Sequence, residues 1–100
     1  MSEAVSQPQG FSLFILSDGT GETAATMIRA ALVQYQKQDI QITRCKNVRT
    51  EPQVESIIQD CFEKRGIIVY TVASPHMRKR IKEIANSNGV LCFDLLGPLL

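Results

Sequence analysis

Four short apolar segments, separated by stretches with helical periodicity, set the pattern of this 100-residue chain. The run Phe11–Leu16 is continuous and closes on the turn-forming sequence Ser17–Gly21, as expected for a buried strand. Ile40–Cys45 alternates loosely between apolar and polar positions, which is typical of a strand with one wet face or at a sheet edge. Ile67–Val72 is continuous and β-branched and predicts a central strand, and Val90–Leu96 predicts the fourth.

Two helices are predicted between the first three strands. The first runs from Thr23 to near Lys37. The second begins at the capping-box pattern of Thr50 and Gln53 and stops at Gly66. Because apolar positions recur at helical spacing, each helix presents one face to the core. These positions are Ala24, Ile28, Ala31, Leu32 and Tyr35 in the first helix and Val54, Ile57, Ile58, Cys61 and Phe62 in the second.

A third helix is predicted before the last strand. Ser74 and Pro75 suit its N-cap and first position, and Gly89 suits its end. Its inward positions are Met77, Ile81, Ile84 and Ala85. Residues 1–10 are polar and predict a flexible tail, followed by a single domain over residues 11–100.

The alternation of strands and helices predicts an α/β fold with a parallel sheet. An edge-like second strand and a central third strand fit the order 2-1-3-4, in a three-layer, Rossmann- or flavodoxin-like domain with four strands and three helices. Right-handed crossovers place the first helix on one face and the other two on the opposite face. Since one helix cannot cover four strands, we expect part of an apolar face to be exposed and to form an interface.

Composition excludes several classes of function. Eleven Lys and Arg against ten Asp and Glu give a formal charge of +1, too little to drive the chain onto nucleic acid or an anionic membrane. The cysteines Cys45, Cys61 and Cys92 match neither a disulfide framework nor a zinc site, so we expect reduced core residues and no metal. The early apolar run Phe11–Leu16 is too short for a signal peptide or a membrane span, which predicts a cytoplasmic location.

The loop after the first strand is the main candidate site. It lies at the switch point of the predicted strand order, ahead of a helix, and comprises Ser17, Asp18, Gly19, Thr20, Gly21, Glu22 and Thr23. Glycines, free amides and hydroxyls suit a phosphate, whereas the carboxylates of Asp18 and Glu22 repel one. The alternative is a glycine turn in which Asp18 or Thr20 caps the helix. It is not a P-loop, because the sequence contains no Gly-Lys pair.

Other polar residues fall on the same predicted rim of the sheet. Arg49 is either a phosphate ligand or an ordinary surface arginine. Thr71 and Ser74 follow the third strand, and Ser74 is also explained as a helix cap. Asp94 ends an apolar strand and needs an arginine, backbone donors or a ligand as its partner. His76, the only histidine, has no catalytic motif around it.

Four parts of the chain together resemble a known family. They are Ser17–Ala24, Val48–Thr50 with Gln53–Val54, Tyr70–Val72 and Asp94–Leu99, in this order. They resemble the amino-terminal half of the pyruvate, phosphate dikinase and phosphoenolpyruvate synthase regulatory proteins, over nearly all of the chain after residue 10. Gly19 stands where many of these relatives carry Ser.

The resemblance implies a bifunctional regulator. Such a protein uses ADP to phosphorylate a threonine of pyruvate, phosphate dikinase or phosphoenolpyruvate synthase, and inorganic phosphate to remove that group with release of pyrophosphate. Family members are longer, and their P-loop-like nucleotide site lies in the second half. The resemblance therefore implies an amino-terminal domain that partners its own carboxyl-terminal domain, holds no cofactor and is inactive alone. The site residues that it implies are the loop from Ser17 to Thr23, Arg49 and Asp94.

Other functions stay open. The loop is also similar to the flavodoxin loop that binds the phosphate of FMN, although Ser74–His76 replaces the aromatic loop that would stack on a flavin. The third helix carries Arg78, Lys79, Arg80 and Lys82, which predict either a solvated face or a protein-docking module. The exposed sheet face predicts a homodimer as an alternative to a covering domain.

Overall fold

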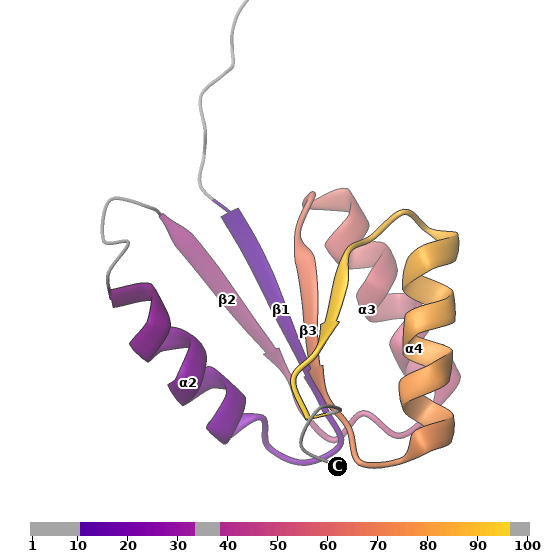
Figure 1. Ribbon diagram of the computed structural model, residues 1–100. Coiled ribbons are helices and arrows are strands. Elements are labelled where there is room, and N and C mark those ends of the chain that lie inside the picture. Colours follow the sequence, from indigo (N-terminus) through magenta and orange to yellow (C-terminus); the bar gives the residue numbers. More distant parts are fainter. Residues whose placement is uncertain (1–10, 34–38, 97–100) are drawn as a thin grey trace, which may run out of the picture.

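The computed structural model describes residues 11–33 and 39–96 as one sheet between two layers of helices (Figure 1). The elements are β1 (Phe11–Ser17), α2 (Glu22–Leu32), β2 (Ile40–Cys45), α3 (Glu51–Glu63), β3 (Ile67–Thr71), α4 (Pro75–Ser87) and β4 (Cys92–Asp94). The predicted tail at residues 1–10, the position Tyr35 and the helix end expected near Lys37 lie outside the described residues.

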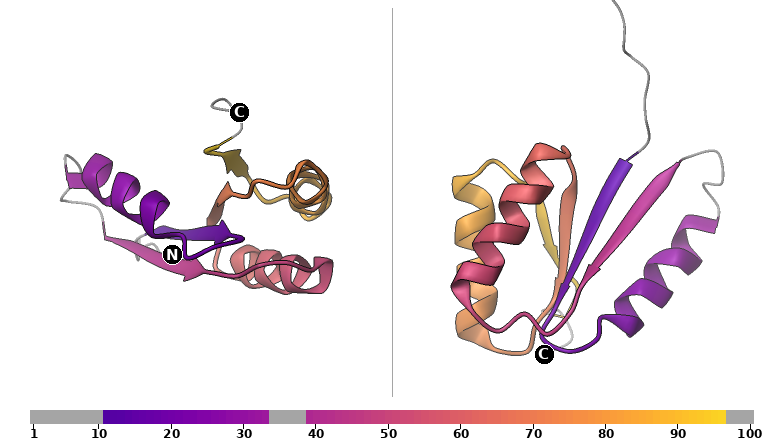
Figure 2. Two further views of the ribbon diagram at one scale, coloured as in Figure 1. Left: turned by 90° about the horizontal axis from the view of Figure 1, so that it is seen from below. Right: turned by 180° about the vertical axis from the view of Figure 1, so that it is seen from behind.

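The sheet has the predicted topology. Its strand order is β2-β1-β3-β4, and every neighbouring pair is parallel. β2 is therefore an edge strand and β3 a central one, as expected. Figure 2 shows α2 on one face of the sheet and α3 and α4 on the other, which confirms the arrangement required by right-handed crossovers.

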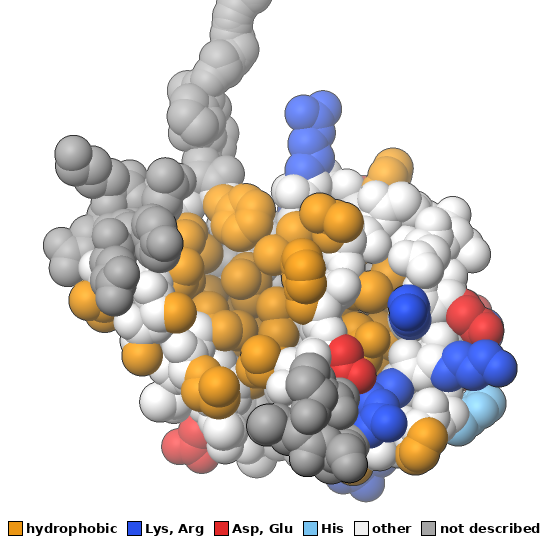
Figure 3. Space-filling view, viewed as in Figure 1, with side chains coloured by type: hydrophobic (Ala, Val, Ile, Leu, Met, Phe, Trp, Pro, Cys, Tyr) orange, Lys and Arg blue, Asp and Glu red, His pale blue; other side chains and the backbone are white. Residues whose placement is uncertain are grey.

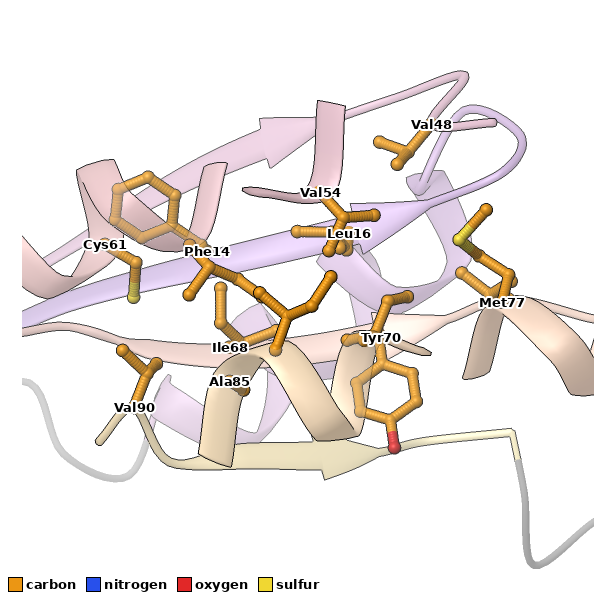
Figure 4. Packing of buried hydrophobic residues seen from close by; sticks show 14 residues of the cluster. Phe14, Leu16, Val48, Val54, Cys61, Ile68, Tyr70, Met77, Ala85 and Val90 are labelled. Atoms are coloured by element: carbon orange, nitrogen blue, oxygen red, sulfur yellow. The ribbon is translucent and has the colours of Figure 1, made fainter. Parts of the chain in front are cut away.

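The main core lies between the sheet and the pair α3 and α4 (Figure 4). Phe14 and Leu16 of β1 and Ile68 of β3 are at most 1% exposed and point into it. Burial of such side chains stabilises the fold by roughly 1.5–3 kcal/mol each. The helices contribute Val54, Ile58, Cys61, Met77, Ile81, Ile84 and Ala85, all of which were expected to face inward.

The starts of α3 and α4 follow the sequence signals. The Thr50 hydroxyl accepts a hydrogen bond from the Gln53 amide, and the Gln53 side chain accepts one from the Thr50 amide, which completes the predicted capping box. At α4 the Ser74 hydroxyl accepts from the Met77 amide at 3.2 Å. Each side chain satisfies an amide that the helix itself leaves without an acceptor.

Three details of the helices differ from the predictions. Ala31 and Phe62 are exposed, Phe62 to 53%, because each lies at the border of its helix's apolar stripe. The left-handed residue after α3 is Arg65, with φ 55°, rather than Gly66. Gly66 is required for a different reason, since a Cβ there would lie 2.7 Å from the carbonyl oxygen of Ser12. It allows the chain leaving α3 to pass close to β1.

The opposite face of the sheet has a smaller core. Leu13, Ile15 and Val69 pack there against Ala24 and Ala25 of α2. In Figure 3 hydrophobic side chains remain visible across this face, between α2 and β4 of Figure 1. Within residues 11–33 and 39–96, the prediction of an incompletely covered face is thus confirmed.

Candidate functional site

The loop between β1 and α2 is held by the backbone of the connection from β2 to α3. The Val48 amide donates to the Ser17 carbonyl at 2.9 Å, and the Asn47 amide donates to the Gly19 carbonyl at 2.8 Å. Asn47 has a φ of 57°, a conformation that Asn tolerates better than most residues. Val48 is 2% exposed and anchors this connection in the main core.

Two arginines bind the other carbonyls of the loop, those of Asp18 and Thr20. Arg49 donates from Nη2 to the Asp18 carbonyl at 2.9 Å and from Nε at 3.3 Å. Arg44 donates from Nη2 to the Thr20 carbonyl at 2.8 Å. The two backbone amides and two guanidinium groups thereby engage four consecutive carbonyl oxygens of the loop. These bonds fix the loop's backbone conformation through its carbonyl groups.

Several amides at the start of α2 lack a protein acceptor. The Glu22 amide donates to the Thr20 hydroxyl at 3.2 Å, so Thr20 serves as a partial cap, one of the two alternatives considered. The first helical bond runs from the Ala25 amide to the Gly21 carbonyl. Among bonds within the described residues, none uses the amides of Thr20, Gly21, Thr23 and Ala24. The helix therefore starts with exposed positive partial charge, the condition that favours an anion.

The Asp18 carboxylate has a partner in another loop. Its Oδ2 accepts a hydrogen bond from the Ala73 amide at 3.1 Å, next to Ser74, the N-cap of α4. Asp18 thus places negative charge near the positive end of α4 and does not cap α2. This contact explains a carboxylate in a loop that otherwise suits anions.

The structure divides the predicted site residues between two surface hollows. One, of about 340 Å³, lies on the α2 side, and the other, of about 490 Å³, lies on the side of α3 and α4. Ser17, Thr20, Gly21, Thr23 and Thr71 line the first, whereas Asp18, Arg49 and Ser74 line the second. Gly19 and Asp94 line neither. We call the first hollow the α2 hollow and the second the α4 hollow.

The register of the sheet explains the composition of the α2 hollow. Ser17 and Thr71 are paired on β1 and β3, which places their side chains together at the carboxyl end of the sheet. Met27, Leu95 and Leu96 provide the apolar part of the lining. Glu22 is the only acidic residue in this lining. The hollow therefore combines hydroxyls, free amides and apolar surface.

Asp94 has an arginine and a backbone donor as partners, two of the three alternatives that the sequence left open. Its Oδ2 lies 3.7 Å from Nε of Arg78, and its Oδ1 accepts a hydrogen bond from the Leu96 amide at 3.1 Å. Arg78 also donates to the Ala73 carbonyl at 3.4 Å. These contacts tie the end of β4 to the start of α4.

The basic residues of α4 do not all face solvent. Arg80 binds both carboxylate oxygens of Glu51, at 3.0 and 3.1 Å, and also donates to Glu83 at 2.6 Å. The hydrogen bond from Arg80 lowers the pKa of Glu51. His76 lies 3.6 Å from the same carboxylate, with its side chain 73% exposed. Of the four basic residues predicted on this helix, Lys79 and Lys82 are exposed.

The three cysteines are free thiols. Burial raises the pKa of each, and that of Cys61 reaches about 11, so the thiols remain protonated at neutral pH. Across residues 11–33 and 39–96, no three His, Cys, Asp or Glu side chains gather as metal ligands would. No helix in the same ranges has the length and apolarity needed to cross a membrane.

Sequence analysis did not select Arg44. It pairs with Ile15 in register and lies on the same face of β2 as Ile40 and Ile42. The sequence signal that could have identified Arg44 was its charge, because it stands among the alternating apolar positions of an edge strand. Its distant partner, the Thr20 carbonyl, is 24 positions away along the chain.

Comparisons with known proteins show the family to which this chain belongs. A model of the family described as kinase/pyrophosphorylase matches residues 13–100. A Bdellovibrio bacteriovorus protein named as a pyruvate, phosphate dikinase regulatory protein is 61% identical over 90 residues, which are 90% of this chain and 32% of that protein. A Trichlorobacter lovleyi protein of the same name is 36% identical over 88 residues, 88% of this chain and 33% of that protein.

The matches cover most of this chain but only part of each relative. The chain spans about a third of the length of the curated relatives it matches. Within this chain, by contrast, the family match is nearly complete after the first twelve residues. The chain belongs to the kinase/pyrophosphorylase family.

Proposed function

We propose that this chain is the amino-terminal part of a bifunctional regulator of pyruvate, phosphate dikinase or phosphoenolpyruvate synthase. The regulator phosphorylates a threonine of its target with ADP as donor, and uses inorganic phosphate to remove that group with release of pyrophosphate. The observation that carries this proposal is the family match over residues 13–100, together with 61% identity to a protein named as a pyruvate, phosphate dikinase regulatory protein.

Within that protein, this part contributes an anion site in the α2 hollow. Support comes from the amides of Thr20, Gly21 and Thr23, which have no acceptor within the described residues, and from the neighbouring hydroxyls. The Asp18 carboxylate bonds to the Ala73 amide, so its charge is partly offset there. Arg49 acts as a positioning residue through the Asp18 carbonyl.

A phosphate titration followed by amide NMR tests the anion site. We expect the amides of Thr20, Gly21 and Thr23 to shift with phosphate and with sulfate, while residues of β2 do not. Thr23→Val, which removes a lining hydroxyl, should weaken the response. Thr26→Val is the matched control, because Thr26 is exposed one turn further along and does not line the hollow. Equal effects of the two variants, or no loop shifts, would contradict an anion site.

Turnover assays test whether residues 1–100 are active without the rest of the regulator. We expect residues 1–100 alone to neither phosphorylate nor dephosphorylate either target, because this sequence contains no Gly-Lys phosphate loop. Phosphothreonine would be followed with ADP or phosphate present, using the full-length Bdellovibrio relative as the positive control. Catalytic turnover by the short chain would show that the chemistry resides in these residues.

That the loop binds the phosphate of FMN stays a separate prediction. In the described residues the segment after β3, Ala73–His76, has no Trp, Tyr or Phe side chain with which to stack a flavin. A purified chain that absorbs in the visible range like a flavoprotein would favour this alternative over the regulator.

A further inference from the structure

The sheet face beneath α2 exposes large apolar side chains. Phe11, Met27 and Phe93 are 40%, 51% and 53% exposed. Strand alternation places Phe11 on the same face as Leu13, and Phe93 pairs in register with Val69 of the same cluster. The hydrophobic area is continuous in Figure 3. We call the surface formed by Phe11, Met27, Ile67 and Phe93 the open face.

The helix on this side is too small a cover. The buried residues of α2 are Ala24 and Ala25, whose side chains are short. In the described part of the chain, α3 and α4 pack on the other face, so β4 has no helix above it here. Soluble proteins rarely leave an apolar area of this kind without a partner.

The chain beyond β4 is directed onto the open face. The Leu95 amide donates to the Tyr70 carbonyl at 3.0 Å, which extends the sheet pairing by one residue. The Leu95 side chain packs with the cluster of Leu13 and Val69. Leu96 lines the α2 hollow together with Met27. Residues that immediately follow β4 therefore lie against this side of the sheet.

We propose that the open face is the surface on which the polypeptide beyond this region packs in the longer family members. The matched relatives continue for about two thirds of their length outside the region aligned with this chain. A segment joined covalently to β4 has a high effective concentration at the face, which favours it over a second copy at the same dilution. The inference rests on family membership and not on the activity proposed above.

The experiment compares this chain with an extended one. Residues 1–100 are joined to the part of the Bdellovibrio protein that follows its matched 90 residues. A hydrophobic dye should bind the short chain and should not bind the extended one. The thermal midpoint of each protein and its sedimentation over a concentration series are measured in parallel.

Two phenylalanines provide a matched pair of variants. Phe93 on the open face and Phe62 on α3, against the other face, are both 53% exposed. In the short chain we expect neither Phe93→Glu nor Phe62→Glu to lower the thermal midpoint. In the extended chain, Phe93→Glu should lower it and restore dye binding, while Phe62→Glu should not.

Three outcomes overturn the proposal. They are dye binding by the extended chain at the level of the short one, equal effects of the two substitutions in the extended chain, and a dimer that Phe93→Glu abolishes. The last result would assign the face to a second copy. If the extended chain does not fold, amide exchange is compared between the short chain and the natural full-length relative. Because β4 is already paired with β3, its amides should exchange more slowly in the longer protein than in the short chain, and equal exchange contradicts the proposal.

Discussion

The two faces of one sheet differ in how completely they are covered. Strands β1 and β3 are apolar on both sides, yet the side facing α3 and α4 buries Phe14, Leu16 and Ile68 almost fully. The other side also buries Ile15 of β1, but it leaves Phe11 of β1 and Phe93 of the neighbouring β4 partly in solvent. The difference follows from topology, because one connection crosses on one face and two cross on the other. Strand composition alone therefore does not reveal which face is closed.

The helices of the two sides also begin differently. α3 and α4 start with side-chain caps from Thr50 and Ser74. α2 starts at Gly21 with φ 74° and no side-chain bond at the N-cap itself. The open side thus combines a smaller core with a helix start that leaves amides available. The same features that weaken packing there make the α2 hollow suitable for a ligand.

The largest contrast in the free energy of unfolding is expected when an isoleucine is shortened to alanine on each face. Ile58→Ala on the closed side should lower the free energy of unfolding by about 2–5 kcal/mol, since Ile58 is fully buried. Ile28→Ala on α2 should cost about 1 kcal/mol or less, because Ile28 is only partly buried. Urea unfolding of both variants measures the difference. Equal losses would mean that the two faces are equally well packed.

The loop that joins β1 to α2 allows a comparison of two glycines. Gly21→Ala should lower the free energy of unfolding by about 1–2 kcal/mol, because a side chain at positive φ is strained. Gly19→Ala should change it by about 0.5 kcal/mol or less, since the added Cβ meets only the Ser17 hydroxyl at 3.9 Å. Gly19→Ser should be tolerated equally. Loss of stability at Gly19 alone would contradict this loop geometry.

A pH-dependent effect should arise on the closed side from Cys61. Burial raises the pKa of this thiol to about 11, so the folded state binds its proton more tightly than the unfolded state. This contribution is fully present below the ordinary thiol pKa and is lost as the pH rises toward about 11. Unfolding free energies across that range should fall more steeply for the wild type than for Cys61→Ala. Parallel curves would show that burial does not control this thiol.

The smallest effect is expected from the exposed contact between α3 and α4. Arg80 lowers the pKa of Glu51, so the contribution of this pair is present above the ordinary Glu pKa. It is lost as the pH falls through the lower pKa of the folded state. Glu51→Gln should therefore reduce stability slightly at neutral pH and lose its effect in acid. Glu55→Gln, an exposed residue of the same helix, is the control. A difference that persists unchanged in acid would contradict the ion pair.

Periodicity was sufficient to predict most of the fold. The alternation in β2 and the continuous run of β3 led to the correct strand order, and Ser74 with Pro75 marked the start of α4. Periodicity does not settle positions at the border of a helical stripe: Ala31 and Phe62 fit the inward pattern but are exposed. At such positions a rotation of the helix by a few tens of degrees decides between core and solvent.

The candidate loop was found from the sequence, but its internal arrangement was not. Two glycines, hydroxyls and a following helix are local features, and Gly21 indeed has the positive φ that they suggest. The bonds from Arg44 and Arg49 to loop carbonyls join residues 24 and 31 positions apart. The contact of Asp18 with Ala73 spans 55 positions. Partners at such separations depend on sheet register, which no local pattern encodes.

The sequence by itself determined the elements, their order in the sheet and the presence of one incompletely covered face, because periodicity and crossover handedness are local or topological properties. Only the tertiary structure decided that the predicted site residues divide between two hollows and that Gly66 is needed for close approach to Ser12. Those outcomes depend on which atoms meet across the sheet. That in turn depends on twist, register and side-chain direction, all of which are settled when the chain packs.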